Sequence, residues 1–203
     1  AQMVTQAVWS KDSPLKQIPY FTNELVKRCQ DNKIENVFDL LDMDDEPRRK
    51  LLDVPENQLV KVAEFCNKYP SIDVKYNLSN EGYTNACENV QITIELERDD
   101  AIAESVIAPY FPYSRDEAIW VVVGDSISDT LLAIKRVSLL KSSTVKLDIT
   151  APEEAGQHNY NLYVISDSYI GSDQEFTLTL HVNASNRKRK TPADESEQAK
   201  TKA

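Results

Sequence analysis

The chain has 203 residues, of which 41% are hydrophobic and 28% are charged, and its formal net charge at pH 7 is −10. This length suffices for one large domain or two small ones with real hydrophobic cores. No apolar run approaches the roughly 20 residues that a membrane-spanning helix needs, so we expect no membrane partner.

The charge is unevenly distributed along the chain. Residues 72–183 hold 7 basic and 18 acidic side chains, a balance of −11, whereas residues 184–203 hold 6 basic and 3 acidic ones, a balance of +3. Lys and Arg supply most of the affinity of proteins for phosphate backbones. Any contact with nucleic acid is therefore expected from the first 71 residues or from the tail.

Cysteine usage indicates the compartment. Cys29, Cys66 and Cys87 cannot form a closed disulfide framework, and their spacing matches no zinc-binding pattern. We therefore expect a reducing compartment and no metal site. The chain begins at Ala1 without a secretory leader, so we expect a carboxy-terminal fragment of a longer protein rather than an extracellular adhesion module.

Residues 15–71 have the periodicity of short helices, because apolar side chains recur there at spacings of three and four. The stripes are Thr22, Leu25, Val26 and Cys29; Ile34, Val37, Phe38 and Leu41; and Leu59, Val62, Ala63 and Cys66. Pro47 and Pro55 stand where a first helical turn tolerates proline, and Pro70 follows the last stripe. We predict about four helices, each too short to be stable without the others.

After Pro70 apolar and polar residues alternate, which is the period of a β-strand with one buried face. The alternating runs are 72–78, 90–96, 145–149, 160–164 and 176–182, and two further strands are expected between 118 and 137. Seven strands in about 110 residues predict a sandwich of the immunoglobulin or fibronectin type III kind. The predicted fold is α+β and multidomain: a helix-loop-helix domain over 15–71 and an all-β sandwich over 72–183.

The stretch AIWVVVGDSISDTLLAIKRV, residues 118–137, has the run of valines that ends many nucleotide-binding strands. A phosphate cradle needs more glycines and a following helix, and neither is present. We therefore predict a hairpin in which 119–123 is a central strand covered on both faces and Gly124-Asp125 is the turn that ends it. Trp120 is then a core or interface residue.

Candidates for catalysis are few. His158 is expected in a turn, and His181 in a strand with its side chain opposite to Leu180 and Val182; neither has a nucleophile or metal partner in the sequence. No ATPase signature appears. We predict no catalytic, cofactor-binding or metal-binding residue and no catalysis by this chain alone.

Residues 184–203 lack a cluster of apolar side chains and are predicted to be a disordered basic tail. Arg187, Lys188, Arg189 and Lys190 form a basic run ahead of Thr191-Pro192. Such a run predicts nuclear import or a phosphate-binding tail, and a plain solubilising tail is the alternative. Phosphorylation of Thr191 would weaken import by adding negative charge.

Three blocks of sequence together resemble a known family. They are FCNKYPSIDVKYNL (65–78), VIAPYFPYSRDEAIWVVVGD (106–125) and HNYNLYVISDSYIGSDQEF (158–176). From about Met3 to Val182 the chain resembles the carboxy-terminal Sec-sixty-three homology unit of Ski-two-like helicases, and among these the large spliceosomal DExH-box RNA helicases. Other nuclear helicases and an endoplasmic-reticulum translocation protein carry the same unit, but the basic tail favours the spliceosomal group.

The resemblance implies a unit made of a helical bundle, a helix-loop-helix domain and an immunoglobulin-like domain, with only the last bundle helix left in residues 1–14. In such helicases the parent protein uses ATP and magnesium to separate paired small nuclear RNAs, and its carboxy-terminal cassette is a regulatory, protein-binding platform. The ATP-binding motifs lie outside these residues. The implied partners are the helicase modules of the parent chain and other spliceosomal proteins, in the nucleus.

Protein contacts are expected from aromatic residues. Tyr110, Phe111 and Tyr113 lie in the proline-punctuated stretch APYFPYS, and Trp120 follows in the predicted hairpin. Aromatic side chains are enriched where proteins bind one another. The alternative is that these rings cover the edge of the sandwich.

RNA contacts are the second hypothesis, for a module that touches a strand emerging from the upstream motor. We expect Arg48, Arg49 and Lys50 at the start of a helix and Lys33 in the preceding turn. Helix-start amides and cationic side chains converge on phosphate in such a place. The alternative is a solvated charged face.

Overall fold

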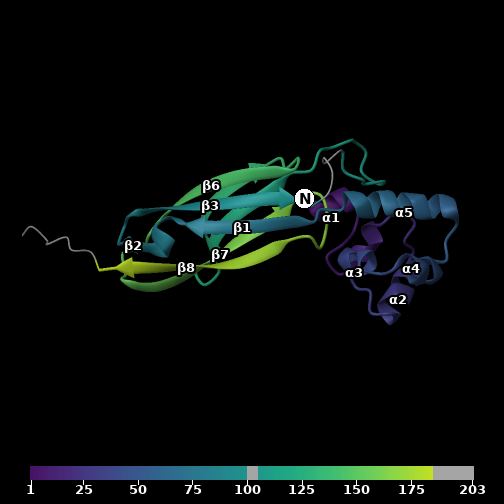
Figure 1. Ribbon diagram of the computed structural model, residues 1–203, viewed down its shortest axis with the longest axis horizontal. Coiled ribbons are helices and arrows are strands. Elements are labelled where there is room, and N and C mark those ends of the chain that lie inside the picture. Colours follow the sequence, from purple (N-terminus) through teal and green to yellow (C-terminus); the bar gives the residue numbers. More distant parts are fainter. Residues whose placement is uncertain (100–104, 185–203) are drawn as a thin grey trace, which may run out of the picture.

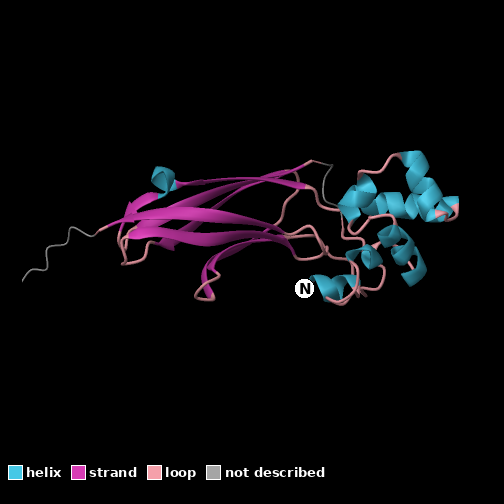
Figure 2. Cartoon of the chain, turned by 90° about the horizontal axis from the view of Figure 1, so that it is seen from below, coloured by secondary structure: helices cyan, strands magenta, loops and turns pink. Residues whose placement is uncertain are grey.

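The computed structural model describes residues 1–99 and 105–184. Figure 1 shows an elongated molecule with the helices gathered at one end and the strands extending away from them. The same separation appears in Figure 2, where the α-helices lie at one end and only the short 3-10 turn at Ser79–Gly82 lies beside the strands. The predicted import residues at 187–190 lie outside the described residues, so the fold does not bear on them.

The helical part, residues 1–71, consists of short elements. They are α1 (Gln2–Gln6), the 3-10 helix η1 (Pro14–Gln17), α2 (Asn23–Asp31), α3 (Val37–Leu41), α4 (Asp45–Leu52) and α5 (Glu56–Lys68). Local signals set their starts: the Thr22 hydroxyl accepts a hydrogen bond from the Leu25 amide at α2, and Asn36 and Asp39 form a capping box at α3. The apolar stripes bury one face of each longer helix in a common core.

The β part, residues 72–184, contains two sheets. Its elements are β1 (Ile72–Leu78), the 3-10 turn η2 (Ser79–Gly82), β2 (Tyr83–Asn85), β3 (Asn89–Arg98), β4 (Ile119–Asp125), β5 (Thr130–Val137), β6 (Ser142–Thr150), β7 (Gly156–Ser166) and β8 (Gln174–Asn183). One sheet has the order β1-β3-β6 and the other the order β2-β8-β7-β4-β5. Buried residues of both sheets form one hydrophobic cluster.

The predicted α+β class is confirmed, and four α-helices follow one another between residues 23 and 68. The β part has one strand more than predicted, because β2 is only three residues long and pairs with β8 in parallel. A strand of three residues is too short to show alternation. The immunoglobulin-like kind of sandwich, and the division of the chain at residues 14, 71 and 183, stay predictions.

The hairpin between 118 and 137 is found, but two details of its prediction are wrong. Ile119, Val121 and Val123 are buried, whereas Trp120 and Val122 on the other face are only half-buried. Residues 119–123 are all apolar because the outer face of β4 carries half-exposed apolar side chains, and not because both faces of the strand are covered. The strand also extends through Asp125, whose carboxylate accepts hydrogen bonds from the amides of the turn that follows it.

The turn between β7 and β8, residues 167–173, inserts into the helical part. Tyr169 is fully buried there, and its ring lies 5.7 Å from the rings of Phe65 and Tyr69, edge to face with both. Burial raises the pKa of Tyr69, and it raises the pKa of Tyr169 to about 12, so both hydroxyls stay protonated at neutral pH. An aromatic residue of the β part thus belongs to the core of the helical part.

Hydrogen bonds fix the same turn from the helical side. The Gln17 side chain donates to the Ile170 carbonyl at 2.7 Å and accepts from the Ile170 amide at 2.9 Å, and the Tyr69 hydroxyl donates to the same carbonyl at 2.8 Å. Gly171 has a φ of +91°, and a Cβ there would lie 3.2 Å from the Tyr69 hydroxyl oxygen. Glycine is therefore the residue that this close approach accepts.

A buried ion pair lies beside the turn. Arg98 at the end of β3 donates to the Glu117 carboxylate at 2.6 Å and to the Lys68 carbonyl at 2.6 Å, and the Ser166 hydroxyl donates to the other carboxylate oxygen at 2.9 Å. The side chains of Arg98 and Glu117 are 3% and 4% exposed. The pair therefore links the end of α5 to β3, to β7 and to the loop ahead of β4, at a place where water does not screen it.

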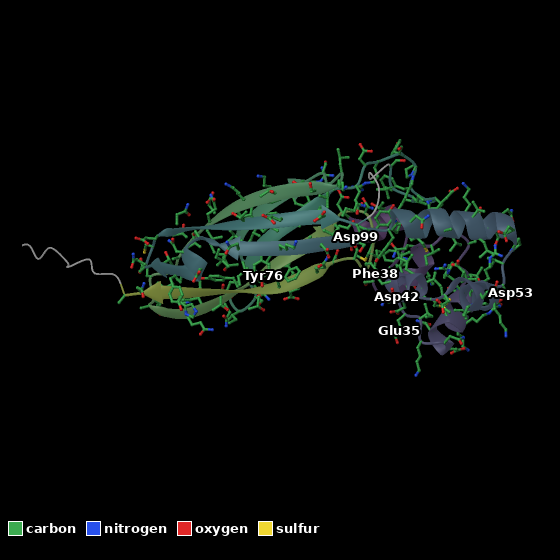
Figure 3. All side chains as sticks on the ribbon, in the orientation of Figure 1. Glu35, Phe38, Asp42, Asp53, Tyr76 and Asp99 are labelled. Carbon is green, nitrogen blue, oxygen red and sulfur yellow. The ribbon has the colours of Figure 1, made fainter. Side chains whose placement is uncertain are left out.

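Aromatic contacts stabilise both parts of the molecule, and Figure 3 labels Tyr76 in the β part and Phe38 in the helical part. Tyr76 on β1 places its ring 5.5 Å from Phe176 on β8, and its hydroxyl donates to the Thr177 carbonyl at 3.3 Å, which ties one sheet to the other. Phe38 in the helical part packs edge to face on Tyr69 at 5.1 Å. Both labelled rings are therefore structural.

We expect Arg98→Met to destabilise the chain by about 3–5 kcal/mol, because it leaves Glu117 buried and unpaired. The double variant Arg98→Met, Glu117→Leu should recover much of that loss, because no buried charge remains. Urea unfolding at pH 7 measures both. Arg49→Met is the control, since its ion pair with Glu56 is exposed and should contribute less than about 1 kcal/mol. Equal losses in Arg98→Met and Arg49→Met would contradict the role given to the buried pair.

Candidate protein-interaction surface

The loop 105–118 ahead of β4 is anchored at its base and exposed at its tip. The Ile107 amide donates to the Tyr169 hydroxyl at 3.1 Å, so the loop is attached to the turn that joins the two parts. At the tip, Tyr110 is 79% exposed and Tyr113 is 76% exposed. A fixed base thus presents aromatic side chains to solvent.

Two arginines connect this tip to β4. The rings of Phe111 and Tyr113 lie 6.4 Å apart, edge to face, and the Arg115 guanidinium lies 5.7 Å from the centre of the Phe111 ring. On the neighbouring strands, the Arg136 guanidinium lies 5.9 Å from the centre of the Trp120 ring. Both distances are those of cation–π contacts. We call Phe111, Tyr113, Arg115, Trp120 and Arg136 the arginine–aromatic surface.

Asp167 holds the two arginines together. Its buried carboxylate accepts hydrogen bonds from Arg115 at 2.9 Å, Arg136 at 2.6 Å, the Ala118 amide at 3.1 Å and the Ser168 hydroxyl at 2.5 Å. Burial by itself would raise the pKa of this carboxyl group, but the hydrogen bonds from Ser168, Arg136 and Ala118 outweigh it and the pKa is lowered. The arginines are therefore positioned before any partner arrives.

A cavity of about 500 Å³ lies within this surface. It is lined by Phe111, Tyr113, Ser114, Arg115, Asp116, Glu117, Ala118, Arg136 and Ser138. Aromatic and arginine side chains around a concave site are typical of the anchor positions of protein interfaces. The cavity can therefore accept a side chain of a partner.

The surface continues over the outer face of the larger sheet. Residues directly opposite in an antiparallel pair share a face, and Trp120 lies opposite Ile165 on β7, while Val122 lies between Tyr163 on β7 and Ile134 on β5. None of these five side chains is fully buried. An exposed apolar patch of this kind often marks an interaction site.

The structure brings three of the four predicted protein-contact residues together. Phe111, Tyr113 and Trp120 meet through Arg115 and Arg136, which the sequence analysis did not select. Tyr110 instead lines a different cavity. The exposure of the loop tip does not fit the alternative in which its rings cover a sheet edge, and the contact role itself stays a prediction.

One missed arginine left a signal in the sequence. Arg136 lies directly opposite Trp120 in the register of the hairpin, so pairing the two predicted strands would have placed it beside that ring. Asp167 left no such signal, because its partners Arg115 and Arg136 lie 52 and 31 residues away.

The predicted RNA contacts do not gather at one helix start. Helix α4 begins at Asp45, so Arg48 is its fourth residue, Arg49 and Lys50 lie in its second half, and Lys33 follows the end of α2. Asp45 and Glu46 lie in the first turn of α4, where the positive end of the helix dipole stabilises negative charge. The helix therefore begins at these acidic residues, ahead of the arginines. The Arg48 side chain reaches back to Asp45 in the first turn of α4, whereas Arg49 and Lys50 lie in its last turn.

Two of these cations also have acidic partners. Arg48 pairs with Asp45, and Arg49 pairs with Glu56 at 2.7 Å. An arginine that is paired with a carboxylate must give up this ion pair to bind a phosphate, which makes the free energy of RNA binding less favourable. RNA contact by these residues stays a prediction without a supporting arrangement.

The remaining reactive side chains have structural surroundings. His158 lies in β7, not in a turn, with a ring nitrogen 2.9 Å from the Glu154 carbonyl, and the His181 ring stacks on Tyr83 at 4.8 Å. Burial raises the pKa of the Cys66 thiol to about 11. Within residues 1–99 and 105–184 no three His, Cys, Asp or Glu side chains are grouped to hold a metal ion, and no helix there is long and apolar enough to cross a membrane.

Comparison with protein families gives one clear match: the model of the Sec63 Brl domain matches residues 1–179. Among curated proteins, the U5 small nuclear ribonucleoprotein 200 kDa helicases of Drosophila melanogaster and Homo sapiens are 48% and 47% identical to the chain, each over 182 residues. The pre-mRNA-splicing factor brr2 of Schizosaccharomyces pombe is 45% identical over 186 residues. Each alignment covers 90% of this chain but only 8% of the relative, so the chain spans a small fraction of their length.

We expect Asp167→Asn to lower the free energy of unfolding at pH 7 by about 2 kcal/mol or more, since hydrogen bonds between charged groups are lost. The folded pKa of Asp167 is depressed, so its contribution is present above the unfolded pKa of about 3.9 and is lost as the pH falls through the folded value. The difference between the wild type and the variant should therefore shrink below about pH 4. Urea titrations from pH 7 to pH 3 measure it.

Asp116→Asn is the matched control for this experiment. Asp116 lines the same cavity but is exposed, so its loss should change stability by less than about 0.5 kcal/mol. A difference between Asp167→Asn and the wild type that persists unchanged to pH 3 would contradict the assignment of the lowered pKa.

Proposed function

The chain belongs to the Sec63 Brl domain family, and on that premise we propose that it is a non-catalytic protein-interaction and regulatory module of a spliceosomal RNA helicase. Its relatives are named as helicases of the U5 small nuclear ribonucleoprotein or as a splicing factor, and the chain corresponds to 8% of their length. ATP-driven unwinding of small nuclear RNA duplexes during pre-mRNA splicing would belong to other segments of the parent protein. The catalytic motifs of a helicase do not lie in this region.

The residues present do not fit ATP and its magnesium ion. The one Gly-Asp strand end, at Gly124 and Asp125, continues through a turn into β5. No helix start with free amide groups follows this strand, so the arrangement that binds phosphate is missing. ATP chemistry is therefore assigned to the parent chain outside these residues.

The arginine–aromatic surface is the observation that carries the proposal. Tyr, Trp and Arg are the residues that contribute most at protein interfaces, and here Tyr113, Arg115 and Arg136 line one cavity while the Trp120 ring contacts Arg136 beside it. Asp167 already fixes the arginines, so binding would lose little side-chain freedom. The partners we propose are the helicase modules of the parent chain and other spliceosomal proteins.

The β part is proposed to be an immunoglobulin-like sandwich. The support is a three-stranded and a five-stranded sheet that share one buried cluster. In this architecture the faces of the sheets are available to partners, because neither the core nor the connections depend on the outward-facing side chains.

The double variant Phe111→Ala, Tyr113→Ala tests the proposed role. We expect it to recover spliceosomal proteins from nuclear extract at least about tenfold less well than the wild type, because two rings of the surface are removed. Quantitative mass spectrometry of the bound proteins measures the ratio. Ile127→Ala is the control, because Ile127 is almost fully exposed in the β4–β5 turn, away from this surface. Equal recovery by the double variant and the wild type would remove the surface from the proposed function.

Nuclear location follows from the proposed role, and the tail offers a separate test. We expect a fluorescent fusion too large for passive diffusion to accumulate in the nucleus less well when Arg187, Lys188, Arg189 and Lys190 are all changed to Ala, since import receptors bind extended basic segments. The ratio of nuclear to cytoplasmic fluorescence measures it. An unchanged ratio would leave the tail as a solubilising extension.

A further inference from the structure

Strand β5 (Thr130–Val137) is an open edge of the five-stranded sheet. It is the last strand in the order β2-β8-β7-β4-β5 and pairs with β4 on one side. In a strand that is paired on one side, every second residue directs its amide and carbonyl groups away from the sheet. Among the residues that the structure describes, no backbone hydrogen bond joins β5 to any element but β4. The edge therefore presents a row of hydrogen-bonding groups to another strand.

The other sheet edges differ from β5. Strand β2 is three residues long, and on β1 the Ile72 carbonyl accepts a hydrogen bond from the Gln174 side chain at 2.6 Å. Strand β6 is long, but its exposed side chains are all polar. On β5, in contrast, Leu131 is 58% exposed and Ile134 is 50% exposed. A long open edge with exposed apolar side chains pairs readily with an added strand.

Lys135 places a positive charge on this edge. It lies opposite Val121, whose face of β4 is buried, yet Lys135 is exposed because β5 has no neighbour on its outer side. Among the described residues its ammonium group makes no hydrogen bond or ion pair. The acidic residues of the hairpin, Asp125 and Asp129, lie at the Thr130 end of the strand, and five rises of about 3.3 Å separate Thr130 from Lys135 by about 17 Å. Salt screens charges at that distance.

The charges of β5 select the kind of strand that can pair with it. Lys135 and Arg136 are its charged residues, and it holds no acidic residue. Arg136 is engaged by Asp167, whereas Lys135 can pair with a carboxylate on a neighbouring strand. A second copy of β5 brings no such carboxylate, and lysine on an edge strand opposes pairing between copies. The edge therefore favours a strand of another protein that carries an acidic side chain.

We propose that β5 binds an extended segment of a partner protein as an added strand, with one acidic side chain opposite Lys135 and apolar side chains beside Ile134. Main-chain hydrogen bonds supply the affinity of such complexes and side chains supply the specificity. The charge of −11 over residues 72–183 disfavours a run of acidic residues, so a single carboxylate in an otherwise uncharged strand fits best.

This inference deepens the proposed function and rests on it. Ile134 lies opposite Val122, and Arg136 lies opposite Trp120, so the apolar side chains of an added strand would extend the outer face that adjoins the arginine–aromatic surface. One partner can therefore occupy the edge and that surface together.

The probe is the fluorescein-labelled peptide GSGSVTVEVTV, titrated with the chain and followed by fluorescence anisotropy. Its valines form one face of a strand, and its glutamate lies on the other face between two threonines. We expect saturable binding that is about tenfold weaker for GSGSVTVKVTV, because that peptide brings a lysine to Lys135.

Charge reversal on the protein tests the pairing. We expect Lys135→Glu to bind the lysine peptide about tenfold better than the glutamate peptide, the reverse of the wild type. Lys146→Glu is the matched control, because Lys146 is exposed on β6 at the edge of the other sheet and should leave the preference unchanged. Both side chains are exposed, so both variants should keep the thermal midpoint of the wild type. An unchanged preference in Lys135→Glu, or a reversal in Lys146→Glu as well, would overturn the proposal.

Methylation of the peptide amides tests strand addition on the wild-type chain. Alternate amides of an added strand point toward β5 and toward solvent. N-methylation of the glutamate and both threonines, or of the two central valines instead, should therefore abolish binding in one case and preserve it in the other. Equal effects would overturn the proposal, as would tighter binding of a decauridylate than of the glutamate peptide, or a dimer in sedimentation that Lys135→Glu alters. No titration here uses spliceosomal proteins, so failure at this edge leaves the test on Phe111 and Tyr113 standing.

Discussion

The placement of Tyr169 is the constraint on which the rest of this structure depends. A side chain from the turn between two strands completes the core of the helical part, and the hydrogen bonds of Ile170 and the buried pair of Arg98 and Glu117 surround it. Polar groups this deeply buried stay paired only if both parts keep one arrangement. The helical and β parts are therefore one structural unit rather than two linked by a hinge.

The candidate interaction surface depends on that turn. Its first residue, Asp167, fixes the arginines of the arginine–aromatic surface, and the hydroxyl of Tyr169 holds the base of the loop that carries Tyr110 and Tyr113. Loops that bind partners need a rigid support, and here the support and the loops are connected through the same few residues.

The sequence predicted what depends on local periodicity and missed what depends on long-range contacts. The helices of residues 23–68 and seven of the strands were predictable, because burial of one face imposes a spacing that can be counted. The first turn of α4 was predictable too, because Pro47 is tolerated there, but the pairing of Arg49 with Glu56 in the next helix was not. In the candidate surface the aromatic residues were selected by type, whereas Asp167 has partners in two other elements that only the folded chain brings near. The half-exposed outer face of β4 was mistaken for a buried one, because an unpaired apolar face and a covered one have the same composition.

The long β7 strand, which ends at that turn, gives the molecule a mechanical property. Its 11 residues extend about 35 Å, given a rise of about 3.3 Å per residue, from the junction toward the far end of the molecule, as Figure 1 shows. With no hinge at its base, the β part acts as a lever arm on the helical part. A rotation of 10° at the helices would carry the far end of the sheet through about 6 Å, on the order of one strand spacing. A partner bound at that far end would therefore be displaced when a protein bound to the helices rotates, although the two bound proteins do not contact each other.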